Sequence, residues 1–355
     1  MKSQQTILLL TVLACTSALA QQKAKNVVIF FGDGVGISSL NAASILGHKE
    51  AQSLYVQHMP HLALADSSST AQWVTDAGAA ATAMATGRKT ANRMLSTYPE
   101  KDPAPPKGWT GKTIVEYAEE KGLSTGLISD VGLIEPLISA FYAHQDDRNK
   151  TVEVVSQLLT PRFGDGVDVV IGGGRKKLME AFGPAADELS SKFDSKGYTF
   201  ADSLHALESN KKPRYVVVVD DSNFDLSEAV QRTIEILSRN PKGFFLAVHY
   251  DCHVKDAAKS LQRVLILDKV IQAVAEKHSR DTLVMLTADH AYGIRVQGQR
   301  VLKSEDFMSQ VAIVDEHLAE EVPVLAVGPG SDRVQGFVPN TKVFDWTMQA
   351  FGWHQ

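Results

Sequence analysis

Short runs of apolar, often β-branched residues alternate with amphipathic segments along the chain. Each run is apolar at nearly every position, as in strands that are covered on both faces of a parallel sheet. We predict strands at 26–31, 124–129, 168–173, 215–219, 244–250, 282–287 and 322–327, and the clearest helices at 113–122, 226–240 and 256–278. This alternation predicts an α/β fold, a three-layer α/β/α sandwich with a mostly parallel central sheet.

The first 20 residues predict a signal peptide rather than part of the fold. Lys2 precedes an apolar stretch, and Ala18-Leu19-Ala20 offers a small-x-small cleavage site. We expect cleavage after Ala20, export to the periplasm or the medium, and a single domain over 21–355. Acylation of Cys15, which would give a lipoprotein, fits the residues before it poorly.

Composition excludes several other classes. The formal net charge of −5 and the lack of a long basic run argue against a nucleic-acid partner. No other stretch reaches the roughly 20 apolar residues of a membrane span. Once the signal peptide is removed, Cys252 is the only cysteine, so we expect no internal disulfide. The proline-rich stretch 98–112 predicts a surface loop.

Carboxylates and histidines follow several of the predicted strands. The candidates are Asp33 in a glycine-rich turn, Asp289 and His290 after TLVMLT, the segment HYDCH at 249–253, and His317 before VPVLAV. Because the carboxyl ends of parallel strands share one edge, we expect these side chains to meet there. Taken singly, each could be a tight turn, an ion pair, a polar helix face or a solvated loop histidine. Together they indicate a metal site, and mixed carboxylate and imidazole ligands favour zinc over magnesium or calcium.

The segment VTDAGAAATAMATGRKT, residues 74–90, predicts a buried helix that begins after Asp76. A helix N-terminus directs free N–H groups at an anion, and small side chains would let such a ligand approach. Tight packing alone would also explain the small residues.

These pieces together resemble the alkaline phosphatase family. The resemblance runs from Asn26 to Gly352 and is carried, in the family's order, by VVIFFGDGVG, VTDAGAAATAMATGRKT, SAFYAHQDDR, DVVIGGGRK, TLVMLTADHAYG and VPVLAVGPG. It implies an exported phosphate monoesterase with two zinc ions, whose ligand is a phosphate monoester or inorganic phosphate. A homodimer is left open.

The resemblance also assigns residues. The matches to zinc ligands are Asp33, Asp289 and His290 at one ion, and His253 and His317 at the other. The remaining ligand of the second zinc is Asp251 or His249, and the sequence does not choose, because this chain is shorter there than the family pattern. Arg148 matches the arginine that grips phosphate through a bidentate fork, although alone it could form a surface salt bridge.

The chain departs from the family pattern at the nucleophile. Ala77 stands where the family has the serine that attacks phosphorus, and a methyl group cannot form a phosphoenzyme. Thr75 and Thr82 carry hydroxyls nearby but in the wrong register. We therefore predict inactive or strongly impaired hydrolysis, with attack by metal-activated water as the route that would remain.

The magnesium site of the family is a second departure. Leu137 replaces its threonine ligand, Glu135 stands where the family often has His or Asp, and the expected glutamate before Asp251 is missing. We therefore predict that the magnesium site is lost.

Two other functions compete with impaired hydrolysis. One is a non-catalytic phosphate- or phosphoester-binding pseudophosphatase, and the other is a sulfatase-like hydrolase. The sulfatase reading requires a C/S-x-P-x-R motif, which the sequence lacks. Cys252 could bind zinc as a thiolate or could simply fill a buried position.

Overall fold

The structure is a computed structural model, which describes residues 23–99, 111–209, 214–220, 224–297 and 307–353. The predicted signal peptide and most of the proline-rich stretch lie outside these ranges. No helix among the described residues has the length and apolar character to cross a membrane.

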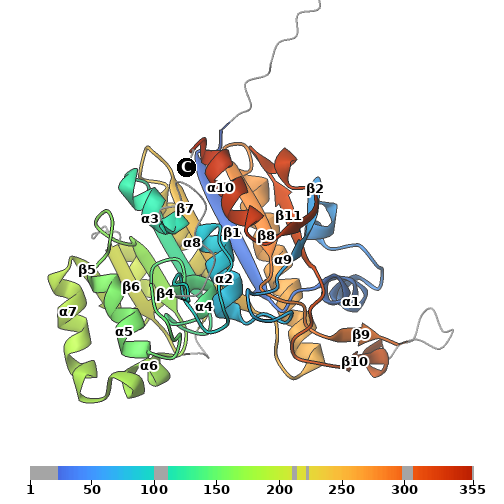
Figure 1. Cartoon of the computed structure of the whole chain (residues 1–355), viewed down its shortest axis with the longest axis horizontal. Coiled ribbons are helices and arrows are strands. Elements are labelled where there is room, and N and C mark those ends of the chain that lie inside the picture. The colour runs from blue at the N-terminus through green and yellow to red at the C-terminus, as the bar shows by residue number, and fades with distance from the viewer. Residues whose placement is uncertain (1–22, 100–110, 210–213, 221–223, 298–306, 354–355) are drawn as a thin grey trace, which may run out of the picture.

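A ten-stranded sheet forms the middle layer of the fold (Figure 1). Its order is β12-β2-β11-β8-β1-β7-β3-β4-β6-β5. The strands are β1 (Asn26–Asp33), β2 (His61–Asp66), β3 (Ser124–Ser129), β4 (Val169–Gly172), β5 (Tyr198–Ala201), β6 (Arg214–Val218), β7 (Phe244–Asp251), β8 (Thr282–Thr287), β11 (Val322–Val327) and β12 (Gly336–Pro339). All strands from β8 to β5 are parallel, and β11 runs antiparallel to both of its neighbours. The predicted α/β fold with a mostly parallel sheet is confirmed.

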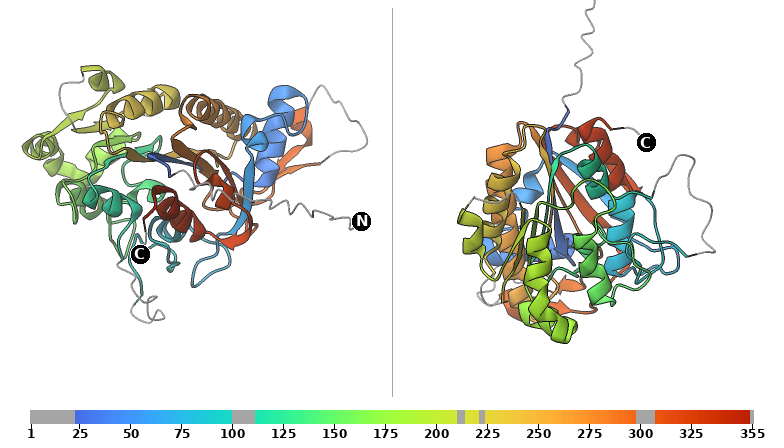
Figure 2. Two further views of the ribbon diagram at one scale, coloured as in Figure 1. Left: turned by 90° about the horizontal axis from the view of Figure 1, so that it is seen from above. Right: turned by 90° about the vertical axis from the view of Figure 1, so that its left-hand side faces the viewer.

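Helices cover both faces of this sheet (Figure 2). Helices α8 (Leu226–Leu237) and α9 (Ala257–His278) pack on one face, and α2 (Ala77–Thr86), α3 (Ile114–Glu120), α4 (Pro136–Ser139) and α10 (Lys342–Phe351) on the other. The remaining helices are α1 (Ile37–His48), α5 (Thr151–Ser156), α6 (Arg175–Phe182) and α7 (Leu189–Ser195). A two-stranded sheet of β9 (Ile294–Val296) and β10 (Val311–Ile313) lies apart from the main sheet.

The central strands are fully buried, which explains their continuous apolar sequence. Every residue of β1 is buried, and the same holds for β8. Strand β7 is buried up to its last residue, Asp251. Since β7, β1 and β8 are adjacent and parallel, the residues that end them lie side by side at one edge of the sheet. The core therefore fixes where any chemistry at that edge can take place.

One buried carboxylate lies away from that edge. Glu119, at the end of α3, accepts hydrogen bonds from the Thr125 hydroxyl and from Gly166 N. Burial, together with the charges of Asp168 and Asp165, raises the pKa of Glu119 from 4.5 to about 8.

This raised pKa predicts a stability that falls with rising pH. The folded protein keeps the Glu119 proton up to about pH 8, whereas the unfolded chain releases it near 4.5. The free energy of unfolding should therefore fall between these values. Urea titrations over this pH range measure the decrease. We expect the free energy of unfolding of Glu119→Gln to decrease by on the order of 2 kcal/mol less than that of the parent. An unchanged pH dependence in the variant would contradict this assignment.

Candidate metal and phosphate site

The candidate metal ligands come from the ends of the three central strands. Asp33 is the last residue of β1 and lies opposite Asp251, the last residue of β7. His253 follows the end of β7 by two residues, and Asp289 and His290 follow the end of β8 by two and three residues. The parallel register of these strands is what places all of these side chains at one edge.

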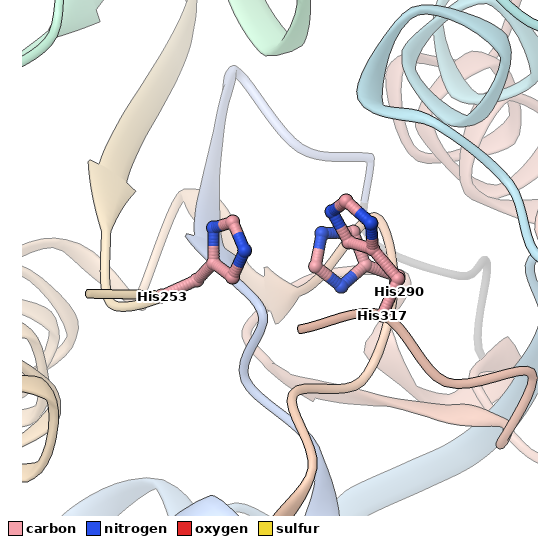
Figure 3. A group of neighbouring side chains, drawn as sticks. All are labelled: His253, His290 and His317. Atoms are coloured by element: carbon pink, nitrogen blue, oxygen red, sulfur yellow. The ribbon is translucent and has the colours of Figure 1, made fainter. Parts of the chain in front are cut away.

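His317 reaches the same place from a distant part of the sequence. Leu318, the residue after it, pairs with Ala291 in an isolated antiparallel bridge, in which Leu318 N donates to Ala291 O at 3.0 Å. Figure 3 shows the rings of His253, His290 and His317 gathered together. The His290 and His317 ring centroids are 4.0 Å apart, and each lies 5.1 Å from that of His253.

Asp33 lies at the centre of the imidazoles. Its Oδ1 is 3.4 Å from His290 Nε2 and 3.6 Å from His253 Nδ1. Its Oδ2 is 3.4 Å from His249 Nε2. The two oxygens of one carboxylate thus face two different groups of donors.

Four groups of side chains bring their donor atoms within 4.8 Å of one another. They are Asp33–Asp289–His290, His253–His290–His317, Asp33–Asp251–His253 and Asp33–Glu135–His249. Asp251 and His249, the two alternatives for the remaining ligand of the second zinc, therefore belong to different groups. Asp251 lies with His253, whereas His249 lies with Glu135. A polar helix face, one of the alternatives for single candidates, does not explain the histidines of HYDCH, because His249 lies within β7 and His253 follows that strand.

The charges of this region perturb one another strongly. Burial opposes ionisation of Asp33, but its hydrogen bond with His249 and the positive charges of His290 and His253 hold its pKa well below the usual range. Burial and the neighbouring Asp33 raise the pKa of Asp289. Burial would lower the pKa of His290, yet Asp289 and Asp33 raise it. The site thus concentrates buried carboxylates and imidazoles, the arrangement that a bound cation stabilises.

The predicted helix after Asp76 is present as α2, which begins at Ala77. Asp76 caps it, since its Oδ1 accepts from Ala79 N at 3.0 Å. The other oxygen of Asp76 lies 3.0 Å from Arg148 Nη1 and accepts from Arg93 N at 2.9 Å. Arg148 is thereby held at the N-terminus of α2, beside the half-buried Ala77.

The N-terminus of α2 and the metal-ligand candidates are close in space. The charge of Asp76 contributes to the raised pKa of His290. A cavity of about 310 Å³ is lined by both Arg148 and Glu135, and also by Asn149 and Lys177. An anion held by Arg148 would therefore lie near both the metal ligands and this cavity.

Sequence reasoning missed Asp130 and Ser129. Asp130 Oδ1 accepts from Asp251 N at 2.9 Å and lies 3.6 Å from His249 Nδ1, while its Oδ2 pairs with Arg263. Ser129 Oγ is 3.0 Å from the same His249 nitrogen. Both residues end or follow β3, so the rule that ligand chemistry follows parallel strands could have found them.

Cys252 lies between two candidate ligands but belongs to none of the four groups. It is buried, and burial raises the pKa of its thiol well above the ordinary value. Among the described residues it forms no disulfide. These properties favour the explanation that Cys252 fills a buried position.

Buried carboxylate and imidazole clusters at the carboxyl edge of an open α/β sheet are typical of metal-dependent hydrolases. The alkaline phosphatase family model matches residues 24–314, so the chain belongs to the alkaline phosphatase family.

Curated relatives match over most of both chains. Alkaline phosphatase of Escherichia coli (strain K12) is 27% identical, with 95% of this chain and 88% of the relative covered. The tissue-nonspecific isozyme of Homo sapiens is also 27% identical, over 92% of this chain and 75% of its own.

Solved structures show the same fold. The alkaline phosphatase of the Antarctic bacterium TAB5 matches with a TM-score of 0.78 at 21% identity, over 94% of this chain and all of its own. That of Thermus thermophilus matches with a TM-score of 0.77 at 20% identity, over 94% and 92% of the two chains. The family is metal-dependent and acts on phosphate esters, which agrees with the presence of candidate metal-ligand groups here.

Proposed function

We propose that this protein binds phosphate or a phosphate monoester at a two-zinc site and hydrolyses the ester weakly or not at all. The observation that carries the proposal is Ala77. It is the first residue of α2, next to the Asp76–Arg148 pair, and it has no group that could attack phosphorus.

The donor set fits two zinc ions. Asp33 Oδ1 and Asp289 Oδ2 are buried and accept no hydrogen bond from the described residues, so the protein leaves these oxygens without a donor. We assign Asp33, Asp289 and His290 to one ion and Asp251, His253 and His317 to the other. Asp251 is preferred to His249 because it shares a group with His253. When bound, zinc would stabilise negative charge on phosphate oxygens.

Neither nearby threonine is free to replace the missing serine. The Thr75 hydroxyl donates to Asp76 O at 3.0 Å. The Thr82 hydroxyl donates to Met94 O at 3.2 Å and accepts from Ser96 N at 2.9 Å. Both side chains are buried. These contacts support loss of the nucleophile rather than its relocation.

Phosphate binding, by contrast, needs no hydroxyl at position 77. The Arg148 guanidinium supplies charge and a planar fork, and the cavity beside it would accommodate the organic part of an ester. Non-catalytic binding and weak hydrolysis therefore share one site and differ only in turnover. Export through residues 1–20 and assembly as a homodimer remain predictions from the sequence.

The test is to titrate zinc-loaded protein with inorganic phosphate by calorimetry and to assay a chromogenic phosphate monoester at alkaline pH. We expect binding that a chelator abolishes, with turnover about 10⁴-fold or more below that of an active relative assayed alongside. Turnover at the relative's rate would overturn the proposed impairment. Absence of phosphate binding would overturn the proposed site.

Arg148→Ala tests the phosphate contact directly. Loss of a charged, bidentate donor should weaken phosphate binding by about 1.5–3 kcal/mol, or roughly 10- to 150-fold in Kd. Arg93→Ala is the matched control, because that guanidinium pairs with Asp147 on the surface. We expect the control to change the Kd less than about threefold. Equal losses in both variants would indicate a general charge effect instead of a contact.

A further inference from the structure

Glu135, His249 and Asp33 form a separate group of candidate ligands. Asp33 Oδ2 lies 3.4 Å from His249 Nε2, and the Glu135 carboxylate completes the group within 4.8 Å. Asp33 Oδ1, in contrast, faces His290 and His253. One carboxylate thus separates the two-zinc site from a third cluster, which the proposed function does not use.

His249 is oriented as a metal ligand would be. It is 0% exposed, and its Nδ1 lies 3.0 Å from Ser129 Oγ and 3.6 Å from Asp130 Oδ1. A metal-binding histidine usually donates its other ring N–H to such an oxygen, which leaves the first nitrogen free to coordinate. Here the remaining nitrogen is Nε2, which faces Asp33 Oδ2 in a 3.4 Å hydrogen bond that a bound ion would replace.

Glu135 brings a second carboxylate to this cluster. Its carboxylate lies within 4.8 Å of the donor atoms of Asp33 and His249. Two carboxylates converging on one imidazole leave an excess of negative charge, which a divalent ion would balance.

These donors do not fit the magnesium ion that the family resemblance would place there. Magnesium takes oxygen ligands in a near-ideal octahedron. In this chain Leu137, 0% exposed, replaces a threonine hydroxyl, and the imidazole of His249 contributes nitrogen. Imidazole suits zinc and other late first-row ions far better than magnesium.

We propose that Asp33, Glu135 and His249 form a third metal site that takes zinc or a similar divalent transition ion instead of magnesium. The inference rests on the proposed function only in sharing Asp33 with the two-zinc site. The alternative is a metal-free network in which His249 bridges Asp33 and Asp130 as an ion pair.

The test counts metal ions and locates them. Protein stripped with chelator would be reloaded with zinc in the presence of excess magnesium, desalted, and analysed by elemental mass spectrometry. A crystal of the loaded protein would be measured on both sides of the zinc absorption edge. We expect three zinc ions per chain, with one anomalous peak between Asp33, Glu135 and His249. Two zinc ions with that position empty or filled by magnesium would overturn the inference, and an empty two-zinc site would overturn the proposed function instead.

Variants separate the third ion from the other two. Glu135→Gln and His249→Gln should each lower the zinc count from three to two. His205→Gln, at an exposed histidine away from the cluster, should leave it at three. The double variant His249→Glu/Leu137→Thr restores oxygen donors and should exchange the third zinc for magnesium. Three zinc ions in both single variants would overturn the assignment. Circular dichroism melts check that each variant is folded, and the anomalous map of the parent decides the question if one is not.

Discussion

Replacing Ala77 with serine is expected to raise phosphomonoesterase turnover of the zinc-loaded protein by about 10³-fold or more. The substitution adds one hydroxyl at the first residue of α2, beside the backbone N–H groups of the helix start and Arg148, where we propose that the anion binds. Ala77 is half-buried and small, so serine should fit without displacing its neighbours. The measurement is kcat and kcat/KM for a chromogenic monoester, with metal and after chelation.

Two controls test whether the gain in turnover comes from a hydroxyl at position 77. Ala79→Ser adds a hydroxyl two residues along the same helix, at a buried position, and should give no turnover. Phosphate affinity should change little in Ala77→Ser, since the proposed binding contacts do not involve the side chain at position 77. If Ala77→Ser stays inactive although it binds zinc and phosphate, the metals or Arg148 are misplaced for catalysis, and the defect is larger than one missing oxygen.

Much of the fold follows from the sequence because burial leaves a simple pattern. All seven predicted strands are present, with ends shifted by no more than two residues, since each strand is a continuous apolar run within a covered sheet. Short edge strands such as β5 and β12 escaped prediction. They are partly exposed, so their sequences lack that continuous apolar character.

The site was harder to predict for a geometric reason. Sequence alone identifies which residues follow strands, but not which donor groups they join. His249 and Asp251 point to the same side of β7, since they are two residues apart, yet one pleat separates them along the strand. That step of roughly 7 Å places Asp251 near His253 and leaves His249 beside Glu135. The position of Glu135 depends on the loop before α4, for which the sequence offers no periodic pattern.

Asp33→Asn is expected to remove most of the metal-dependent stability of the protein. Asp33 belongs to three of the four donor groups, so no other candidate ligand is shared as widely. An ion present at about 1,000 times its Kd stabilises the folded state by about 4 kcal/mol. Asp33 is a ligand of one ion of the proposed two-zinc site and of the proposed third ion, and these two ions would together raise the Tm of a chain of this length by about 10 °C. Asparagine keeps the shape of the side chain but lacks the charge, so we expect the Tm shift between stripped and zinc-loaded protein to be smaller in the variant than in the parent by about 10 °C.

Scanning calorimetry with and without zinc measures this shift, and metal analysis of the same samples shows whether ions are lost. Asp289→Asn should give an intermediate result, because Asp289 belongs to one group only. Asp187→Asn, at an exposed position away from the site, should match the parent. The comparison between Asp33 and Asp289 is the informative one. Removing a ligand that two ions share must reduce the zinc-dependent Tm shift more than removing a ligand of one ion. Equal reductions in the two variants would show that Asp33 binds a single ion and that the sites are independent.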